Sequence, residues 1–276
     1  MALDQHLNLE IRFRQQVDNA REYLLPFLQP WMQTGSGLRV MEIGCGEGGV
    51  LRAFAEQGAW CLGVDLSESR IRTAQALMAE EIAAGQAEFI AQNVYDPAFE
   101  ARWAGQFDWI VLKDTIEHIP EQERFIPYLV RFLKPGGKVF FGFPPWYMPF
   151  GGHQQICRSR LGSKLVWMHL LPRGAYARLL RALGEPEQIV SDLLEIQDTG
   201  LTIARFERIL RRSGHVILAR TLFLINPIYR YKFGLRPRRQ LRLLAAVPPL
   251  RESLTTAAWY VVEPLQQAEG LPNITA

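Results

Sequence analysis

The chain has 276 residues, 48% of them hydrophobic, which is enough for one large core and fits a single α/β domain that carries an elaboration. No run reaches about 18 apolar residues, which argues against a membrane-spanning helix, and polar residues between Asp4 and Glu10 interrupt the apolar stretch that a signal peptide needs. The scattered Cys45, Cys61 and Cys157 exclude a disulfide framework. These features predict a cytoplasmic protein.

The first half of the chain alternates short β-type runs with helical stretches. An N-terminal segment has apolar residues at helical spacing between Asp4 and Leu28 and is broken by Pro26 and Pro30. The expected strands are 38–43, 60–65, 89–92, 107–112 and 138–143, and the expected helices are 50–57, 67–84 and 120–133. Ser67 is expected to cap a helix that Gly85 ends. This alternation favours a parallel sheet with helices on both faces.

The pattern changes after residue 143, where prolines, glycines and aromatic residues form a stiff loop. A partly helical region follows, and then a helix at 202–212 leads to strands at 215–223 and 257–262. The predicted organisation is an N-terminal helical segment (1–35), the core of the sheet (36–145), an inserted region (146–200), the end of the sheet with a basic segment (201–264) and a tail (265–276).

The strongest chemical signal is VMEIGCGEGG at 40–49, where a strand runs into glycines that open a helix. Glycine lets the backbone pass close to a ligand and adopt dihedral angles that other residues resist. Gly44, Gly46 and Gly49 fit the GxGxxG fingerprint, and Asp65 follows about twenty residues later, where an acid would bind a ribose. This pattern fits either NAD or S-adenosylmethionine (SAM), and the alternative is a tight turn without a ligand.

Glu42 helps to separate the two cofactors. A carboxylate two residues before the first glycine can hold a cationic amino group, whereas it offers nothing to a pyrophosphate. Further motifs are FDWIV at 107–111, DTIEHI at 114–119 and LKPGG at 133–137, the last followed by a strand. On these motifs the chain resembles the class I SAM-dependent methyltransferases, particularly their small-molecule branch, over residues 36–145 and more weakly over 201–262.

The resemblance implies an α/β, Rossmann-like sheet of seven strands in the order 3-2-1-4-5-7-6, with helices on both faces. The seventh strand is antiparallel in this family, and residues 257–262 would take its place between strands five and six. The resemblance also implies SAM as the cofactor. The expected fold also includes a partly helical insertion after strand five.

The cofactor-binding residues that the resemblance implies are Glu42, Gly44, Cys45, Gly46, Asp65, Leu66, Asn93, Val94 and Lys113. The two glycines would line the methionine and ribose portion with support from Glu42, and Asp65 would hold the ribose hydroxyls. A role for Asp65 as the neighbour of a helix cap is the alternative.

Two positions depart from the family. Asn93, where the family often has Asp, would approach the adenine amino edge beside the Val94 backbone, and its alternative is a turn residue. Lys113 follows the fourth strand near the expected methionine end. Its ammonium would pair with the methionine carboxylate or turn outward.

Methyl transfer from a sulfonium is an in-line displacement, so the protein mainly aligns the acceptor and, for a hydroxyl or amine, removes its proton. His118, after the fourth strand, and His153, after the proline-rich loop, are the candidate catalytic bases. The alternative for His118 is a capping or packing role. Glu117 is a weaker candidate, typical of a solvated helix-end carboxylate. No metal-ligand spacing occurs, which favours a metal-independent mechanism.

The inserted region lies where the family often builds its acceptor pocket. Trp146 and Tyr147 follow the exit of the fifth strand and are the expected substrate-binding residues. The alternative is a helical cap with its own small core.

From Arg205 to Glu252 the chain carries twelve Lys or Arg and two acids. Aromatic residues interleave with these cations at 228–233, and an ArgProArgArg cluster follows at 236–239. Such a segment suits an anionic, partly apolar acceptor or peripheral contact with the inner face of the membrane. A solvated charged face is the alternative, and nucleic acid is disfavoured.

The leading hypothesis is a SAM-dependent methyltransferase for a small-molecule or lipid-type acceptor. O-methylation is favoured slightly over N- or C-methylation because a histidine base serves a hydroxyl. An NAD-dependent oxidoreductase is disfavoured by Glu42 and by the ProGlyGly segment before strand five. A catalytically silent module of the same fold, which binds a partner protein or a membrane, is the third hypothesis. The sequence leaves the acceptor and the oligomeric state open.

Overall fold

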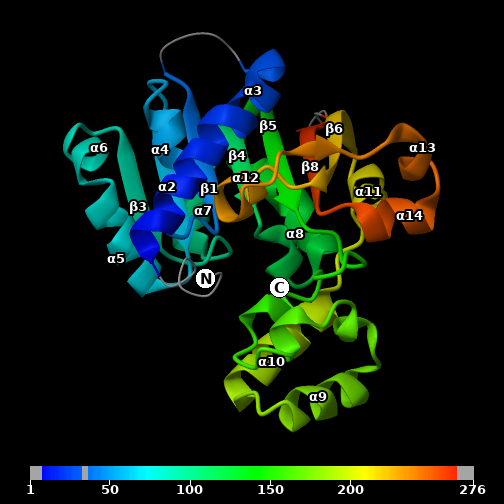
Figure 1. Cartoon of the computed structure of the whole chain (residues 1–276). Coiled ribbons are helices and arrows are strands. Elements are labelled where there is room, and N and C mark those ends of the chain that lie inside the picture. The colour runs from blue at the N-terminus through cyan, green and yellow to red at the C-terminus, as the bar shows by residue number, and fades with distance from the viewer. Residues whose placement is uncertain (1–7, 33–36, 266–276) are drawn as a thin grey trace.

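The computed structural model describes residues 8–32 and 37–265, so the start of the predicted N-terminal segment and the predicted tail after residue 265 lie outside the described residues. An eight-stranded sheet runs through the molecule in the order β3-β2-β1-β4-β5-β8-β6-β7 (Figure 1). The strands are β1 Arg39–Ile43, β2 Trp60–Asp65, β3 Ala87–Ala91, β4 Phe107–Lys113, β5 Leu133–Phe143, β6 His215–Ile225, β7 Arg238–Arg239 and β8 Ala257–Pro264.

The strand order confirms the predicted fold. Strands β1 to β5 pair in parallel, and β8 is inserted antiparallel between β5 and β6. The sheet also has one strand that the sequence did not predict. The two-residue β7 pairs with β6 at Phe223 and Ile225, and so short a basic segment carries no strand pattern.

Helices cover the sheet and fill its connections. They are α2 Leu9–Asn19, α3 Leu25–Leu28, α4 Gly49–Ala55, α5 Glu68–Leu77, α6 Ala79–Ala83, α7 Pro97–Trp103, α8 Gln122–Tyr128, α9 Arg173–Ala182, α10 Glu187–Thr199, α11 Ile203–Arg212, α12 Tyr229–Phe233, α13 Arg242–Ala245 and α14 Pro248–Leu254. The Ser67 side chain caps α5 as predicted, and Gly85 follows α6 at φ +70°. In the part of the chain that the structure describes, no helix is long and apolar enough to cross a bilayer.

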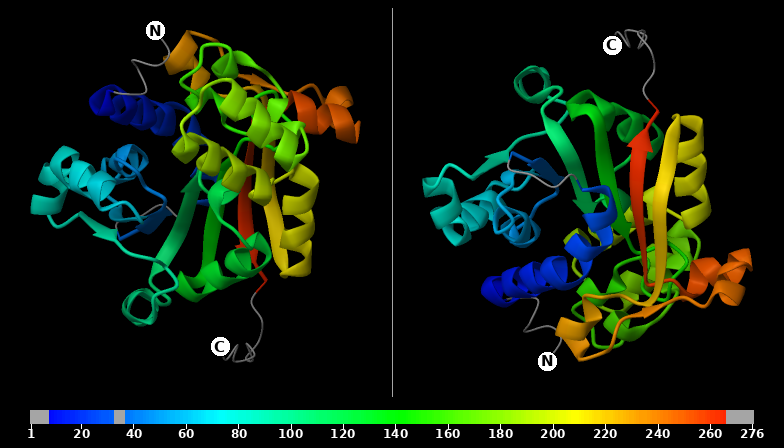
Figure 2. Two further views of the ribbon diagram at one scale, coloured as in Figure 1. Left: turned by 90° about the horizontal axis from the view of Figure 1, so that it is seen from below. Right: turned by 90° about the horizontal axis from the view of Figure 1, so that it is seen from above.

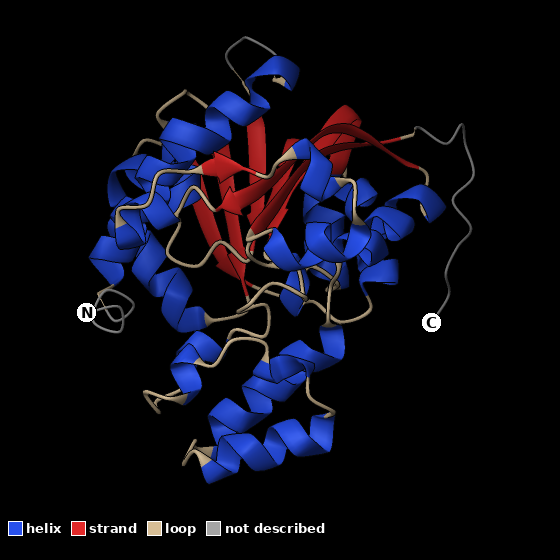
Figure 3. Cartoon of the chain, turned by 45° about the vertical axis from the view of Figure 1, so that its right-hand side comes forward, coloured by secondary structure: helices blue, strands red, loops and turns tan. Residues whose placement is uncertain are grey.

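Two apolar cores lie on the two faces of the sheet, because successive side chains of a strand point in opposite directions. In β1, for example, Val40 belongs to one core and Met41 to the other. Helices lie on both faces of the sheet (Figure 3). The core that contains Val40 packs under α2, α4 and α5, and the core that contains Met41 packs under α7, α8 and α11. Strands that are buried on both faces are apolar along most of their length, as the sequence of β1 and β4 shows.

The segment between β5 and α11 forms a lobe beyond one end of the sheet, with α9 and α10 as its main helices (Figure 1). The lobe has a small apolar core of its own, in which Tyr176, Leu180 and Leu193 are buried. The chain enters the lobe from the carboxyl end of β5 and returns from it through α10.

Two segments about two hundred residues apart in sequence lie side by side, the N-terminal helix α2 with its continuation and α12 (Figure 2). Arg230 Nη1 donates to Glu22 Oε2 at 2.6 Å and to Tyr23 Oη at 2.8 Å. Gln15 Nε2 donates to the backbone oxygen of Tyr231 at 3.3 Å. The basic C-terminal half of the chain is thereby joined to its first described helix.

Candidate functional site

The glycine-rich loop begins where β1 ends and turns into α4. The backbone amides of Gly44 and Cys45 both donate to the oxygen of Val64, at 2.7 and 3.1 Å, which fixes the loop against β2. Gly44 has φ +73°, and a Cβ atom there would lie 2.5 Å from the side chain of Thr115. The loop therefore requires glycine at this position for both conformation and space.

Asp65 joins the end of β2 to the glycine loop. Its carboxylate accepts hydrogen bonds from the Gly46 amide at 3.0 Å and from the Ser67 amide at 2.9 Å. Each carboxylate oxygen can accept a second hydrogen bond, so the group keeps capacity for a ligand. The GxGxxG spacing and the acid that follows it thus meet in one place.

Glu42 carries a carboxyl group into the buried part of β1. The residue is 3% exposed, and its Oε2 has no hydrogen-bond partner among the described residues. Burial raises the pKa of Glu42 well above its ordinary range, and the ammonium of Lys113 opposes this shift. The side chain of Lys113 is itself 7% exposed, and its Nζ donates to Asp114 Oδ2 at 2.7 Å instead of turning outward to solvent.

The other predicted cofactor residues lie at the same carboxyl edge of the sheet. Cys45 is buried, which raises the pKa of its thiol, and Leu66 is 75% exposed directly after Asp65. Asn93 follows β3, and its Oδ1 accepts from the Tyr95 amide at 3.0 Å, as in a side-chain turn. Val94 is buried beside it. The loops after β1, β2, β3 and β4 thus converge here, where ligands of parallel α/β sheets bind.

A second cluster lies after β4 and β5 and contains both predicted catalytic histidines. His118 Nε2 is 3.8 Å from Glu117 Oε1, and His153 Nε2 is 3.9 Å from the same oxygen. The two imidazole centroids are 4.7 Å apart with ring planes at 87°. The structure therefore brings together the candidate bases that the sequence places 35 residues apart.

Glu117 differs from its sequence prediction. The expectation of a solvated helix-end carboxylate was wrong, because the residue is buried and neither carboxylate oxygen has a hydrogen-bond partner among the described residues. Burial and the nearby charge of Asp114 raise its pKa well above the ordinary range. The cause is the loop that carries His153, which covers the carboxyl group from a distant part of the sequence.

Contacts from the lobe hold this cluster in position. Thr199 Oγ1, at the end of α10, donates to the backbone oxygen of Glu117 at 2.6 Å. His153 has φ +57°, and its amide donates to Phe150 O at 3.0 Å. A Cβ atom on Gly152 would lie 2.2 Å from the side chain of His169, so only glycine fits there. Such a constrained, left-handed conformation of a non-glycine residue is typical of functional sites.

Both histidines are held in the neutral form at neutral pH. Burial, together with the neighbouring His118, lowers the pKa of His153 to about 3. The pKa of His118 is also lowered, chiefly because its ring is partly removed from water, and the charge of Arg70 acts in the same direction. The side chain of His118 is nevertheless 41% exposed, so a ligand can reach it.

The two predicted substrate residues occupy different environments. The Trp146 ring packs against the lobe core, and its centroid lies 4.5 Å from that of His169. Tyr147 is exposed, and its backbone oxygen accepts from Trp167 Nε1 at 3.0 Å. Trp146 therefore helps to hold the lobe together, and Tyr147 is the more accessible of the pair.

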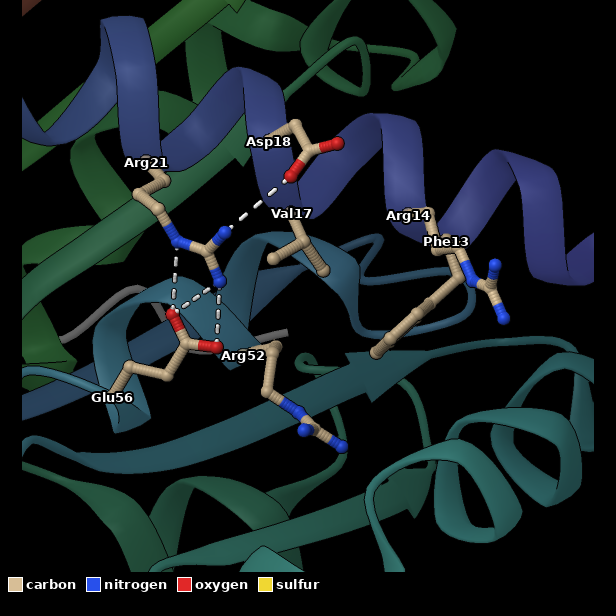
Figure 4. Close-up of a pocket in the computed structure, with 7 residues that line it drawn as sticks. All are labelled: Phe13, Arg14, Val17, Asp18, Arg21, Arg52 and Glu56. Carbon is tan, nitrogen blue, oxygen red and sulfur yellow. Dashed lines mark hydrogen bonds and ion pairs between the residues drawn. The ribbon is translucent and has the colours of Figure 1, made fainter.

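A surface pocket of about 260 Å³ lies apart from both clusters, between α2 and α4 (Figure 4). Phe13, Arg14, Val17, Asp18, Arg21, Arg52 and Glu56 line it. Arg21 Nη2 donates to Glu56 at 2.8 Å across the pocket. Its lining includes none of the predicted site residues, so we place the functional site at the carboxyl edge of the sheet.

The chain belongs to the methyltransferase-domain family, because residues 12–184, more than half of its length, match the family model described as "Methyltransferase domain". This confirms the resemblance to class I SAM-dependent methyltransferases. The chain is 30% identical over 161 residues to a ubiquinone biosynthesis O-methyltransferase of Ralstonia nicotianae, a match that covers 56% of this chain and 63% of that protein. The matches span 63%, 65% and 64% of the first three curated relatives.

Solved structures share the fold at low sequence identity. A geranyl diphosphate methyltransferase in complex with SAM superposes with a TM-score of 0.55 at 16% identity, over 90% of this chain and 85% of that one. The [4+2]-cyclase SpnF superposes with a TM-score of 0.52 at 14% identity, over 87% of this chain and 80% of that one. Since one fold supports such different reactions, the function has to be argued from the site.

Proposed function

We propose that this protein binds SAM and transfers its methyl group to a hydroxyl of a small-molecule or lipid-type acceptor. The observation that carries the proposal is the Glu42 carboxyl group, which is buried without a hydrogen-bond partner for Oε2 two residues before Gly44. A buried acceptor of this kind is costly unless a ligand pairs with it. The cationic amino group of SAM meets that need, and the nicotinamide dinucleotide of the oxidoreductase alternative does not.

The remaining cofactor residues fit the same ligand. The carboxylate of Asp65 is fixed by the Gly46 and Ser67 amides and can accept hydrogen bonds from ribose hydroxyls. The exposed side chain of Leu66 offers an apolar surface for an adenine ring. When bound, SAM supplies an electrophilic methyl group, and the protein contributes the orientation of the acceptor.

O-methylation is supported by the histidine cluster and by the name of the relative from Ralstonia nicotianae. An acceptor hydroxyl loses its proton to a histidine nitrogen as the new C–O bond forms, and the electron pair of the broken C–S bond goes to sulfur. His118 is the better placed base because its side chain is more exposed than that of His153.

Titration calorimetry with SAM, S-adenosylhomocysteine and NAD tests the cofactor. We expect the first two to bind and Asp65→Asn to weaken them by about tenfold or more, since a hydrogen bond to a charged group contributes about 1.5–3 kcal/mol. Asp192→Asn, on α10, is the matched control and should bind like the wild type. Binding of NAD alone, or of neither cofactor, contradicts the proposal.

Transfer of a radiolabelled methyl group from SAM to a panel of phenols and catechols with apolar chains tests the reaction. We expect transfer with at least one of them and a loss of about 100-fold in kcat for His118→Ala, the lower end of general-base contributions. SAM binding without transfer to any hydroxyl favours the silent module.

One part of the basic segment supports a lipid-type acceptor. Several of the segment's arginines pair with acids: Arg205 and Arg230 with Glu123 and Glu22 outside the segment, and Arg220 with Glu207 inside it. Residues 233–251, which we call the basic apolar surface, instead contain five arginines and no acid. Large apolar side chains are exposed on the same surface: Phe233, Leu235, Leu241, Leu243, Val247 and Leu250.

We propose that the basic apolar surface contacts an anionic membrane, since arginines attract anionic headgroups while leucines enter the interface. Co-sedimentation with vesicles of phosphatidylcholine, with and without phosphatidylglycerol, is the test. Binding should require the anionic lipid and should decrease about tenfold or more in Arg238→Ser/Arg239→Ser, at about 1 kcal/mol for each charge. Arg14→Ser/Arg72→Ser removes two exposed charges elsewhere and should bind normally. Equal loss in both variants contradicts a specific surface.

A further inference from the structure

We propose that Glu117, His118 and His153 form a binding site for a divalent transition-metal cation at the acceptor side of the site. One potential ligand atom from each residue lies within 4.8 Å of the other two. The three residues come from the turn after β4 and from the loop after β5, so the fold assembles them although their sequence spacing is unlike that of a metal motif.

Unpaired buried atoms are the first argument for a cation. Both carboxylate oxygens of Glu117 and the Nε2 atom of His153 are buried without a hydrogen-bond partner among the described residues. In folded proteins about nine in ten buried polar groups have a partner. One cation can pair with all three atoms of this cluster, because it can accept a lone pair from each of them.

The surrounding charge is the second argument. Asp114 lies close enough to Glu117, His118 and His153 to influence the charge state of each. Its side chain is 44% exposed, and its backbone has φ +54°, so a second constrained residue faces the cluster. Lys113 neutralises part of this charge by pairing with Asp114 Oδ2. The two neutral imidazoles can each offer a lone pair to a cation, and Glu117 joins them as a carboxylate when the cation displaces its proton.

The ligand set selects the kind of metal. Imidazole nitrogen favours zinc, iron and cobalt, whereas magnesium and calcium favour oxygen ligands. Two histidines and one carboxylate also form the three-ligand sets of catalytic zinc sites, which leave a position open. With bonds of about 2.0–2.2 Å at tetrahedral angles, neighbouring ligand atoms lie about 3.3–3.6 Å apart. The observed separations of 3.8 and 3.9 Å to Glu117 Oε1 therefore need only a small inward movement.

A free coordination position on the metal can bind the acceptor hydroxyl, and this step rests on the proposed function. An acceptor hydroxyl that binds the cation has a lowered pKa and releases its proton to water. The resulting oxygen forms the bond to the methyl carbon while the C–S bond breaks and its electron pair goes to sulfur. The metal would then replace a histidine as the group that activates the hydroxyl, contrary to the expectation of a metal-independent mechanism.

Metal binding can be tested on the full, tag-free chain after treatment with a chelator. We expect Co²⁺ to bind with one-to-one stoichiometry and to give the visible absorption of a nitrogen-ligated ion, Zn²⁺ to compete with it, and Mg²⁺ not to compete. Glu117→Gln and His153→Gln should each weaken Co²⁺ binding by at least about tenfold, since loss of even an outer-shell partner costs about 10- to 100-fold.

His215→Gln is the matched control, because His215 is also buried but begins β6 at the opposite end of the sheet. Circular dichroism checks that each variant folds, and the exposed His118→Gln replaces any variant that does not. Unchanged Co²⁺ affinity and spectrum in the ligand variants overturn the proposal. SAM titration of the same wild-type sample reports the proposed function separately, so failure of one is distinguished from failure of the other.

Discussion

The buried, unpartnered carboxyl group of Glu42 has opposite effects on two properties: it lowers the stability of the unliganded protein and it strengthens ligand binding. Its pKa is raised in the folded chain, so its favourable contribution to folding is present below the ordinary value near 4.5 and is lost as the pH rises. We expect Glu42→Gln to increase the free energy of unfolding of the unliganded protein by about 1–3 kcal/mol at pH 7, the usual cost of an unsatisfied buried group. The same change should weaken SAM binding by about tenfold or more.

Urea denaturation at pH 7 and at pH 4 measures the first effect. The difference between wild type and Glu42→Gln should shrink at the lower pH, because both proteins then carry a neutral group. Glu80→Gln, on the exposed face of α6, removes a carboxylate without burial and should change neither stability nor binding. A destabilised Glu42→Gln protein at pH 7 would falsify the assigned role of burial.

At the level of single residues, some features of the site can be predicted from the sequence and others cannot. Gly46 and Asp65 meet because the strand, the glycines and the following strand are close in sequence, and their spacing carries the signal. Glu117 gave no such signal, because its burial depends on the loop around His153 and on Thr199. Groups whose environment comes from distant segments have to be located from the fold.

At the scale of elements, α11 begins with help from a residue that lies far along the chain. The carboxylate of Glu252, in α14, accepts from the amides of Ile203 and Ala204 at 3.0 and 2.9 Å. An acid at a helix N-terminus satisfies free amides and interacts favourably with the helix dipole. The Thr202 side chain caps the same turn by accepting from the Arg205 amide at 3.0 Å.

Removal of this long-range cap should therefore cost stability. We expect Glu252→Ala to lower the free energy of unfolding by about 1–3 kcal/mol, because two amides lose their acceptor. Urea denaturation measures the change, and Glu195→Ala, exposed on α10, is the control for loss of a helical carboxylate. An effect of Glu252→Ala no larger than that of the control contradicts the capping role.

The sequence predicted elements best where local signals agree. The structure has the predicted strand Trp60–Asp65 and the predicted cap at Ser67. The helix predicted from Thr202 begins one residue later, with Thr202 as its N-cap. The helices of the basic segment and β7 were missed, because these short pieces depend on partners from distant parts of the chain. β7 pairs with β6, α12 contacts α2, and α14 supplies Glu252 to the start of α11. The strand order was predicted through the family resemblance. Local patterns could not give it, since β5 and β8 pair although more than a hundred residues separate them in sequence.

At the scale of the whole molecule, α2 lies against the glycine loop, and α12, from the second half of the chain, lies against α2. α2 packs on the start of α4, where a Cβ atom on Gly49 would lie 2.7 Å from Phe13 O. Arg12 reaches the buried Glu47 of the loop, with Nη2 3.2 Å from Oε1. α12 in turn contacts α2 through Gln15 and Arg230. The loop, α2 and α12 thus form a continuous series of contacts.

This arrangement predicts that a ligand in the glycine loop stabilises α2 and α12 together. Binding to the folded state suppresses the local openings that expose backbone amides, and segments that open as one unit are protected as one unit. We expect saturating S-adenosylhomocysteine to slow amide hydrogen exchange in the glycine loop, in α2 and in α12, as measured by mass spectrometry.

The start of β6, at the opposite end of the sheet, serves as the internal control and should exchange at an unchanged rate. Arg230→Ala, which removes the ion pair to Glu22, should keep protection in the loop and reduce it in α12. Protection of the loop and α2 without any change in α12 of the wild type contradicts the coupling, and equal protection of all segments including β6 indicates a global gain in stability instead of a local closure.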